Sequence, residues 1–64
     1  MNIRFDKETD IVYLRFTDAE IVESDEDKPG VIIDYDKDGN VVGIEMLNAS
    51  KKMKKPGSLV YEVE

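Results

Sequence analysis

The dipeptide Asp38-Gly39 stands between two short apolar segments, residues 31–35 and 41–47, and it constrains the fold more than any other feature. Gly adopts positive φ without a steric cost, so Asp-Gly between two β-type segments is typical of a tight hairpin turn. The connection, residues 36–40, is too short for the crossover that parallel strands need. The sequence therefore predicts an antiparallel β-hairpin.

The alternation of side chains along this hairpin defines two faces. With Asp38-Gly39 at the tip, the predicted register pairs Ile33 with Ile44, Tyr35 with Val42, and Asp36 with Val41. One side, which we name the core face, is almost wholly apolar and carries Val31, Ile33, Tyr35, Val42, Ile44 and Met46. The other side, the mixed face, combines acidic with apolar residues: Ile32, Asp34, Asp36, Val41, Glu45 and Leu47.

The N-terminal part of the chain predicts a second hairpin, because residues 2–5 and 11–16 are β-type and flank the polar residues 6–10. Its second strand adds Val12, Leu14 and Phe16 to the core face, and Ile11, Tyr13, Arg15 and Thr17 to the mixed face. A weaker third strand is expected at residues 21–23. It precedes the acidic segment 24–28 and is ended by Pro29-Gly30.

A single helix is expected after the second hairpin. Asn48 is a suitable N-cap, residues 49–55 have helical character, and lysines in the last turn compensate the helix macrodipole. Pro56-Gly57 ends the helix. Residues 59–63 alternate again, which predicts either a final strand or a loosely docked tail.

Together these elements predict an α+β, mostly β fold: an antiparallel β-meander of about five strands in two hairpins, with one short C-terminal helix and a sixth strand or tail. Residues 1–55 form one domain, and residues 56–64 are a tail or an added strand. Apolar residues occur on both faces, so we expect the mixed face to be covered in part by the helix or by a second subunit.

Composition narrows the class of protein. The chain has 64 residues without Cys, His or Trp, and a domain of this size has a thin margin of stability, which favours a homodimer. The net charge of −6 disfavours nucleic acid and favours a basic protein partner, although Lys51, Lys52, Lys54 and Lys55 could contact phosphates. The N-terminus does not resemble a signal peptide and no apolar segment reaches membrane-spanning length, so a cytoplasmic protein without membrane contact is expected.

Residues 34–45 of the Asp38-Gly39 hairpin also match a calcium loop. Such a loop needs oxygen ligands at positions 1, 3, 5 and 12 and a Gly at position 6, and the chain supplies Asp34, Asp36, Asp38, Glu45 and Gly39. Two helices must flank the loop, whereas residues 31–33 are β-branched and follow Pro29-Gly30. The hairpin is therefore the preferred interpretation. Weak divalent-cation binding by these carboxylates, with hydrolytic activity as a remote extension, is the alternative.

Catalysis has little support in this sequence. Without His or Cys, a Ser or Thr nucleophile would lack the usual base, so we do not predict an enzyme or a cofactor. If the mixed face forms a pocket, its candidate residues are Tyr13, Arg15, Asp34 and Glu45. The other interpretation of these four residues is ordinary cross-strand pairing on a solvated face.

The preferred function is a non-catalytic protein-binding or oligomerisation module. Its partner would dock on the acidic segment 24–28 or on a surface of the mixed face formed by Ile11, Tyr13, Arg15, Ile32, Val41 and Leu47.

Several segments of the chain also resemble the small prokaryotic family catalogued as domain of unknown function 2283. The resemblance rests on residues 3–6, 11–16, 29–36 and 38–45, and on the ending Gly43-Ile44-Glu45-Met46-Leu47-Asn48-Ala49-Ser50. It covers residues 1 to about 52, and no activity, cofactor or catalytic residue comes with it. It implies an antitoxin-like role, in which an acidic domain neutralises a basic partner.

Overall fold

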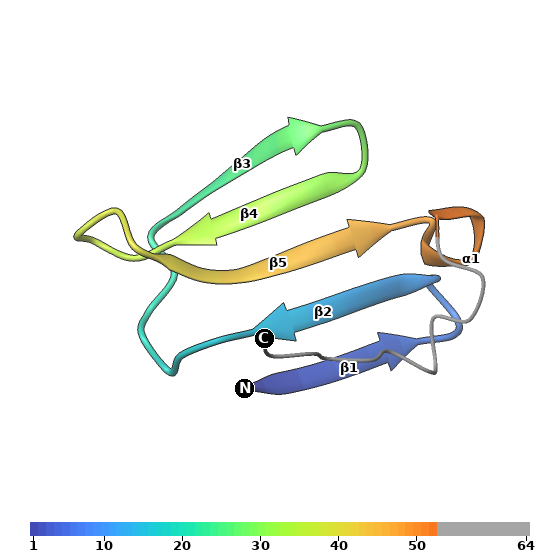
Figure 1. Cartoon of the computed structure of the whole chain (residues 1–64), viewed down its shortest axis with the longest axis horizontal. Helices are drawn as coiled ribbons and strands as arrows, with labels where there is room; N and C mark the ends of the chain where they lie inside the picture. Colours follow the sequence, from blue (N-terminus) through green and yellow to red (C-terminus); the bar gives the residue numbers. More distant parts are fainter. Residues whose placement is uncertain (53–64) are drawn as a thin grey trace, which may run out of the picture.

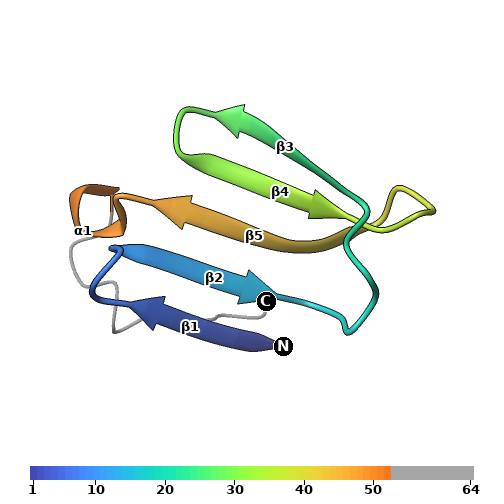
Figure 2. The same cartoon turned by 180° about the vertical axis from the view of Figure 1, so that it is seen from behind.

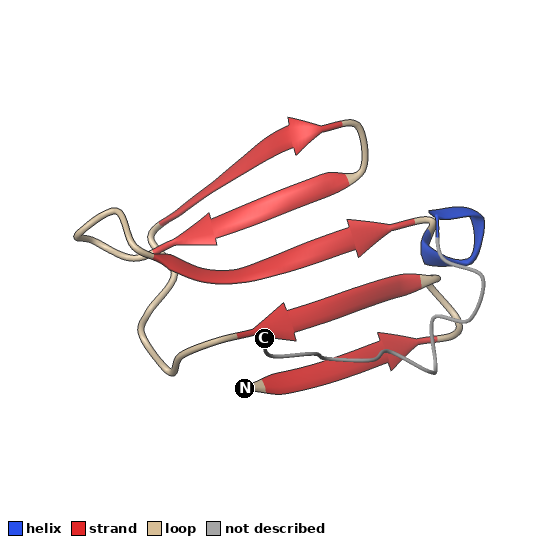
Figure 3. Cartoon of the chain, viewed as in Figure 1, coloured by secondary structure: helices blue, strands red, loops and turns tan. Residues whose placement is uncertain are grey.

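The structure is a computed structural model that describes residues 1–52, in which five strands precede one short helix. The first hairpin consists of β1 (Asn2–Asp6) and β2 (Ile11–Arg15). The strands β3 (Glu23–Lys28), β4 (Val31–Tyr35) and β5 (Val41–Leu47) follow, and α1 (Ala49–Lys52) comes after β5. Figure 3 shows α1 at one end of the sheet.

The strands form one antiparallel sheet in the order β1-β2-β5-β4-β3, which confirms the predicted fold class. Figures 1 and 2 show the sheet from its two sides, with β1 and β3 at the outer edges. The two hairpins are joined in the middle, where β5 pairs with β2. Within residues 1–52, no helix has the length and hydropathy of a membrane span.

The register places most of the predicted core residues on one face of the sheet: Val31, Ile33, Ile44 and Met46 of the second hairpin, with Val12 and Leu14 of β2. Ile44 lies opposite Ile33 on one side and Leu14 on the other, and directly opposed residues point to the same face. Val12, on this face, is 2% exposed, and Val42, which has no partner in the β4–β5 register, is 0% exposed. Ile3 at the edge remains 43% exposed, so burial is concentrated on the central strands.

The turn between β4 and β5 differs from the predicted two-residue tip. Asp36 donates its backbone N–H to the carbonyl of Asn40 (3.0 Å), which leaves a three-residue loop with Gly39 at φ +81°. The longer loop shifts the register by one residue, so Tyr35 lies opposite Val41 and the predicted Tyr35–Val42 and Asp36–Val41 pairs are wrong. A β-bulge after Asp34 restores the predicted register for the rest of the hairpin.

The third strand also differs from the prediction. It covers Glu23–Lys28 and not residues 21–23, so most of the acidic segment expected to be irregular is a strand, and all six of its residues are exposed. Apolar alternation could not locate this strand, because an edge strand is held by backbone pairing with one neighbour. Its register runs from Glu23 opposite Tyr35 to Lys28 opposite Val31, with an irregularity after Glu26.

The start of α1 is capped by a residue from the other hairpin. The predicted cap Asn48 has φ +52°, which is not the extended conformation of an N-cap. Asp10, in the β1–β2 turn, accepts hydrogen bonds from the Ser50 N–H (3.0 Å) and the Ser50 hydroxyl (2.7 Å). The Asn48 prediction was therefore wrong. Residues 53–55 of the predicted helix, and the predicted strand or tail at 59–64, lie outside the described residues.

Candidate functional site

The candidate site lies on the mixed face, along a row of residues that crosses the sheet. Arg15 on β2 and Asp34 on β4 both lie directly opposite Gly43, the residue of β5 between them. Ser24 on β3 continues the row beyond Asp34. In the next row along β2 and β5, Tyr13 lies opposite Glu45. The four residues predicted for a pocket on this face are thus brought together around a glycine.

Gly43 forms the floor of this site because no side chain fits at its position. A Cβ there would lie within 3.0 Å of the Leu14 carbonyl oxygen, closer than Cβ atoms come in real proteins. The close approach of β2 to β5 therefore requires glycine. A hollow of about 220 Å³ opens above this region, lined by Tyr13, Leu14, Arg15, Ile21, Asp34, Val42, Gly43 and Glu45.

One wall of the hollow is a pair of carboxyl groups. Asp34 is only 4% exposed and accepts a hydrogen bond of 2.6 Å from the Ser24 hydroxyl. Burial raises the pKa of Glu45, and the hydrogen bond and the negative charge of Asp34 raise it further. Glu45 therefore holds its proton more tightly in the native state than in the unfolded chain. Its contribution to stability is lost as pH rises from the ordinary glutamate pKa through the raised one.

The opposite wall is formed by Arg15 and Tyr13, and other contacts hold both side chains in place. Arg15 donates through Nε to the Thr17 carbonyl (3.0 Å) and through Nη2 to the Ala19 carbonyl (2.8 Å). The guanidinium of Arg4 lies 4.4 Å from the centroid of the Tyr13 ring, a cation–π contact. The hollow therefore offers hydrogen-bond donors on the Arg15 side and acceptors on the Asp34 side.

A sequence comparison places the chain in a family. The model of the family described as protein of unknown function (DUF2283) matches residues 2–50. The chain belongs to this family. Searches of curated proteins and of solved structures found no match to it. The description of the family assigns no activity to it.

The acidic hairpin tip of this DUF2283 domain is a turn and not a calcium loop. The flanking elements are strands, and Asp36 Oδ1 accepts the N–H groups of Asp38 and Asn40, both at 2.9 Å. The hydrogen bond from the Asn40 backbone holds the pKa of Asp36 below its ordinary value. Within residues 1–52, no three acidic side chains converge as metal ligands would, so Asp34, Asp36, Asp38 and Glu45 do not form one cluster.

Five of the six residues predicted to bind a partner lie on the mixed face of the DUF2283 domain. The register joins five of the six in pairs across this face: Ile11 with Leu47, Tyr13 with Glu45, Arg15 with Gly43, and Ile32 with Glu45. Val41 lies beyond the bulge and is 42% exposed. It is directly opposite Tyr35, so these two residues share a face and do not lie on the different faces predicted for them.

Sequence reasoning missed Gly43, Ser24 and Ile21 as parts of the site. A glycine within an apolar strand was the signal that could have identified the floor of the hollow.

Proposed function

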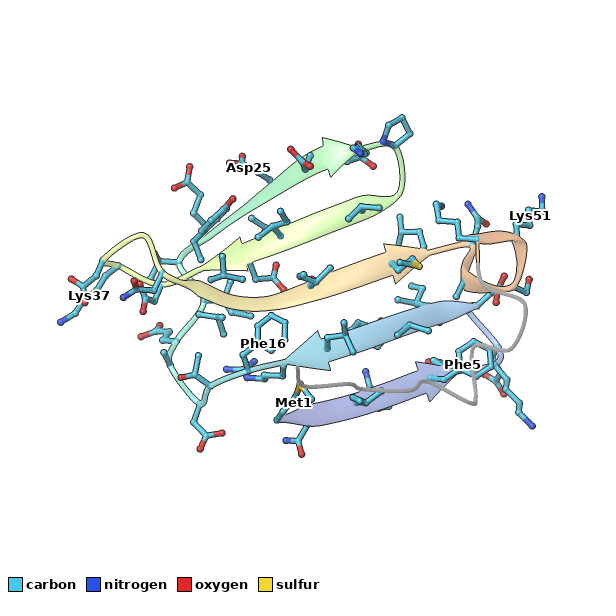
Figure 4. The ribbon with its side chains drawn as sticks, in the orientation of Figure 1. Met1, Phe5, Phe16, Asp25, Lys37 and Lys51 are labelled. Atoms are coloured by element: carbon cyan, nitrogen blue, oxygen red, sulfur yellow. The ribbon has the colours of Figure 1, made fainter. Side chains whose placement is uncertain are left out.

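We propose that the domain is a non-catalytic protein-binding module that uses β3 to pair with an extended basic segment of a partner protein. One observation carries this proposal: β3 is an edge strand whose six residues, Glu-Ser-Asp-Glu-Asp-Lys, are all exposed and include four acids. Figure 4 shows Asp25 on this outer strand, and Lys37 and Lys51 at opposite ends of the sheet.

An edge strand presents backbone N–H and C=O groups on the side away from its neighbour, and an added strand can satisfy them. The backbone groups supply affinity for any extended segment, whereas the side chains select its chemistry. Glu23 and Asp25 lie on one face of β3 and Ser24 on the other, because successive residues of a strand alternate. A basic strand would place its charges opposite these acids.

The same charges oppose pairing of β3 with a second copy of itself, because like charges directly opposite one another destabilise a strand pair. Charged edges also protect sheets from aggregation, and that role alone would explain an acidic strand without any partner. The two explanations differ in one measurable respect: only the first expects specific binding of a basic extended peptide. The predicted homodimer does not depend on β3 and stays a separate prediction.

The test uses two soluble synthetic peptides of alternating residues, lysine with threonine and glutamate with threonine, which have the same β propensity pattern and opposite charge. We expect the lysine peptide to give saturable NMR shifts of the backbone amides of β3 and to leave those of β1, the other edge, unchanged. The glutamate peptide should not bind. An antitoxin-like role requires a basic partner of this kind.

Two double variants separate strand recognition from net charge. Glu23→Lys with Asp25→Lys reverses the charge on β3, and Asp18→Lys with Glu20→Lys makes the same change of net charge in the loop before it. Neither pair includes Ser24 or Glu26, whose side chains hydrogen-bond to Asp34 and to the Gly30 N–H. Loss of binding in both double variants alike, or shifts spread over the whole surface, would show attraction by net charge and contradict the proposal.

A further inference from the structure

The hollow above Gly43 separates two groups of opposite charge that do not satisfy one another. Arg15 gives two hydrogen bonds to the carbonyls of Thr17 and Ala19, and Asp34 accepts the hydroxyl of Ser24. Both residues lie directly opposite Gly43, and adjacent strands are about 4.8 Å apart, so their Cα atoms are separated by about 10 Å. This span is suited to a small molecule that has an anionic group at one end and a cationic group at the other.

The donor side of the hollow is prepared for an anion. A guanidinium carries five N–H groups, and the two bonds to the loop carbonyls fix its position while leaving the others for a carboxylate. Side chains held in this way lose little conformational entropy when a ligand binds. The Tyr13 ring, fixed by its contact with Arg4, adds a wall beside Arg15.

The acceptor side is prepared for a cation. Asp34 is 4% exposed and lies beside Glu45, so the two carboxyl groups present their oxygens at one wall of the hollow. A carboxyl pair with one buried member, Asp34, is costly for a small domain, and a cationic group placed against it would offset part of that cost. Ile21 provides an apolar surface near the hydrocarbon part of a ligand.

We propose that the hollow above Gly43 binds a small zwitterion of the α-amino acid class, with its carboxylate at Arg15 and its ammonium group at Asp34 and Glu45. Neither charged group alone can use both walls, so affinity depends on the two groups together. This site touches β3 only through the hydrogen bond from Ser24 to Asp34, and its test does not depend on the proposed protein-binding function.

The test uses three probes with one hydrocarbon skeleton: L-leucine, 3-methylbutylamine, which lacks the carboxylate, and 4-methylpentanoate, which lacks the amine. Each is titrated into the full chain while the backbone amides of Arg15, Asp34 and Gly43 are followed by NMR. We expect saturable shifts with leucine and at least tenfold weaker binding of the other two, which corresponds to about 1.4 kcal/mol. Glycine is titrated in parallel, because it has the same two charged groups and fits a hollow that is too small for the leucine side chain.

Variants that remove one charge each locate the site. Asp34→Asn and Arg15→Gln should each weaken leucine binding at least tenfold, whereas Asp25→Asn, on the exposed β3 strand, should leave it unchanged. If the amide spectrum of Asp34→Asn shows that this variant does not fold, Glu45→Gln is used in its place to test the same side of the hollow. The proposal is overturned if neither leucine nor glycine gives saturable shifts. Equal affinity for the three probes, or undiminished binding by the variants, overturns it too.

Discussion

Replacing Gly43 by alanine is expected to destabilise the domain at the junction of its two hairpins. The added Cβ would meet the Leu14 carbonyl oxygen within 3.0 Å and the Arg15 Cα at 3.4 Å. Both are backbone atoms of β2, so no side chain can rotate away from the methyl group. The strands β2 and β5 would have to separate. The pairing of these two strands links β1-β2 to β5-β4-β3.

The magnitude follows from two opposing effects. Overpacking costs typically about 1–3 kcal/mol, and the upper end applies because the obstacle is backbone. Alanine recovers about 0.5–1 kcal/mol relative to glycine within a strand, because it restricts the unfolded chain. The net loss is about 2 kcal/mol. For a chain of 64 residues, whose total stability is about 3–10 kcal/mol, this is a large fraction.

The assay is urea unfolding followed by circular dichroism. With a slope of about 1 kcal/mol per molar for a small domain, the midpoint should fall by about 2 M. The matched control is Gly39→Asn, because Gly39 has φ +81° with open space around it and asparagine tolerates that conformation. Hydrogen exchange of the Phe16 amide, which donates to the Val42 carbonyl at 2.8 Å, should accelerate in Gly43→Ala and not in the control.

An unchanged or higher midpoint in Gly43→Ala would refute the steric argument. The same conclusion would follow if Gly39→Asn lost as much stability, because the cost would then belong to glycine replacement in general. A lower urea midpoint for Gly43→Ala without faster hydrogen exchange of the Phe16 amide would show that the strain is relieved elsewhere than between β2 and β5.

Two further predictions concern side chains that connect distant parts of the sheet. Asp10→Ala should cost about 1–2 kcal/mol in urea unfolding because it removes both hydrogen bonds to Ser50, and Asp10→Asn, which tolerates the φ of +58°, should cost less; equal losses would mean that the cap contributes little. Glu45→Gln should make stability less dependent on pH in this range, since the contribution of Glu45 to stability is lost as pH rises from the ordinary glutamate pKa through the raised one. Identical pH profiles would show that Glu45 does not titrate differently in the two states.

Much of the fold could be predicted from neighbours in the sequence. The Asp-Gly turn and the alternation on either side of it identified β4 and β5, and Gly39 does have the positive φ that the turn requires. The predicted partners of Tyr35 and Asp36 were nevertheless wrong by one residue, because two-residue and three-residue loops have similar sequence preferences. The β3 strand was misplaced because its residues carry no apolar alternation.

The candidate site was predictable only as a list of residues. Tyr13, Arg15, Asp34 and Glu45 could be assigned to one face from their parity in the strands, but their proximity depends on β5 pairing with β2. The hollow between them depends on Gly43, whose role becomes visible only when the Leu14 carbonyl is placed beside it.

The sequence by itself determined the local elements: strands that alternate, a glycine turn that reverses the chain, and an acidic composition. Only the tertiary structure decided the contacts between distant segments, such as the hydrogen bonds from Ser50 to Asp10, forty residues away. The physical reason is that turns and alternation depend on residues next to one another. The order of the strands, the cap of α1 and the hollow arise from contacts formed after long loops close, and no local pattern records which distant strand becomes the neighbour.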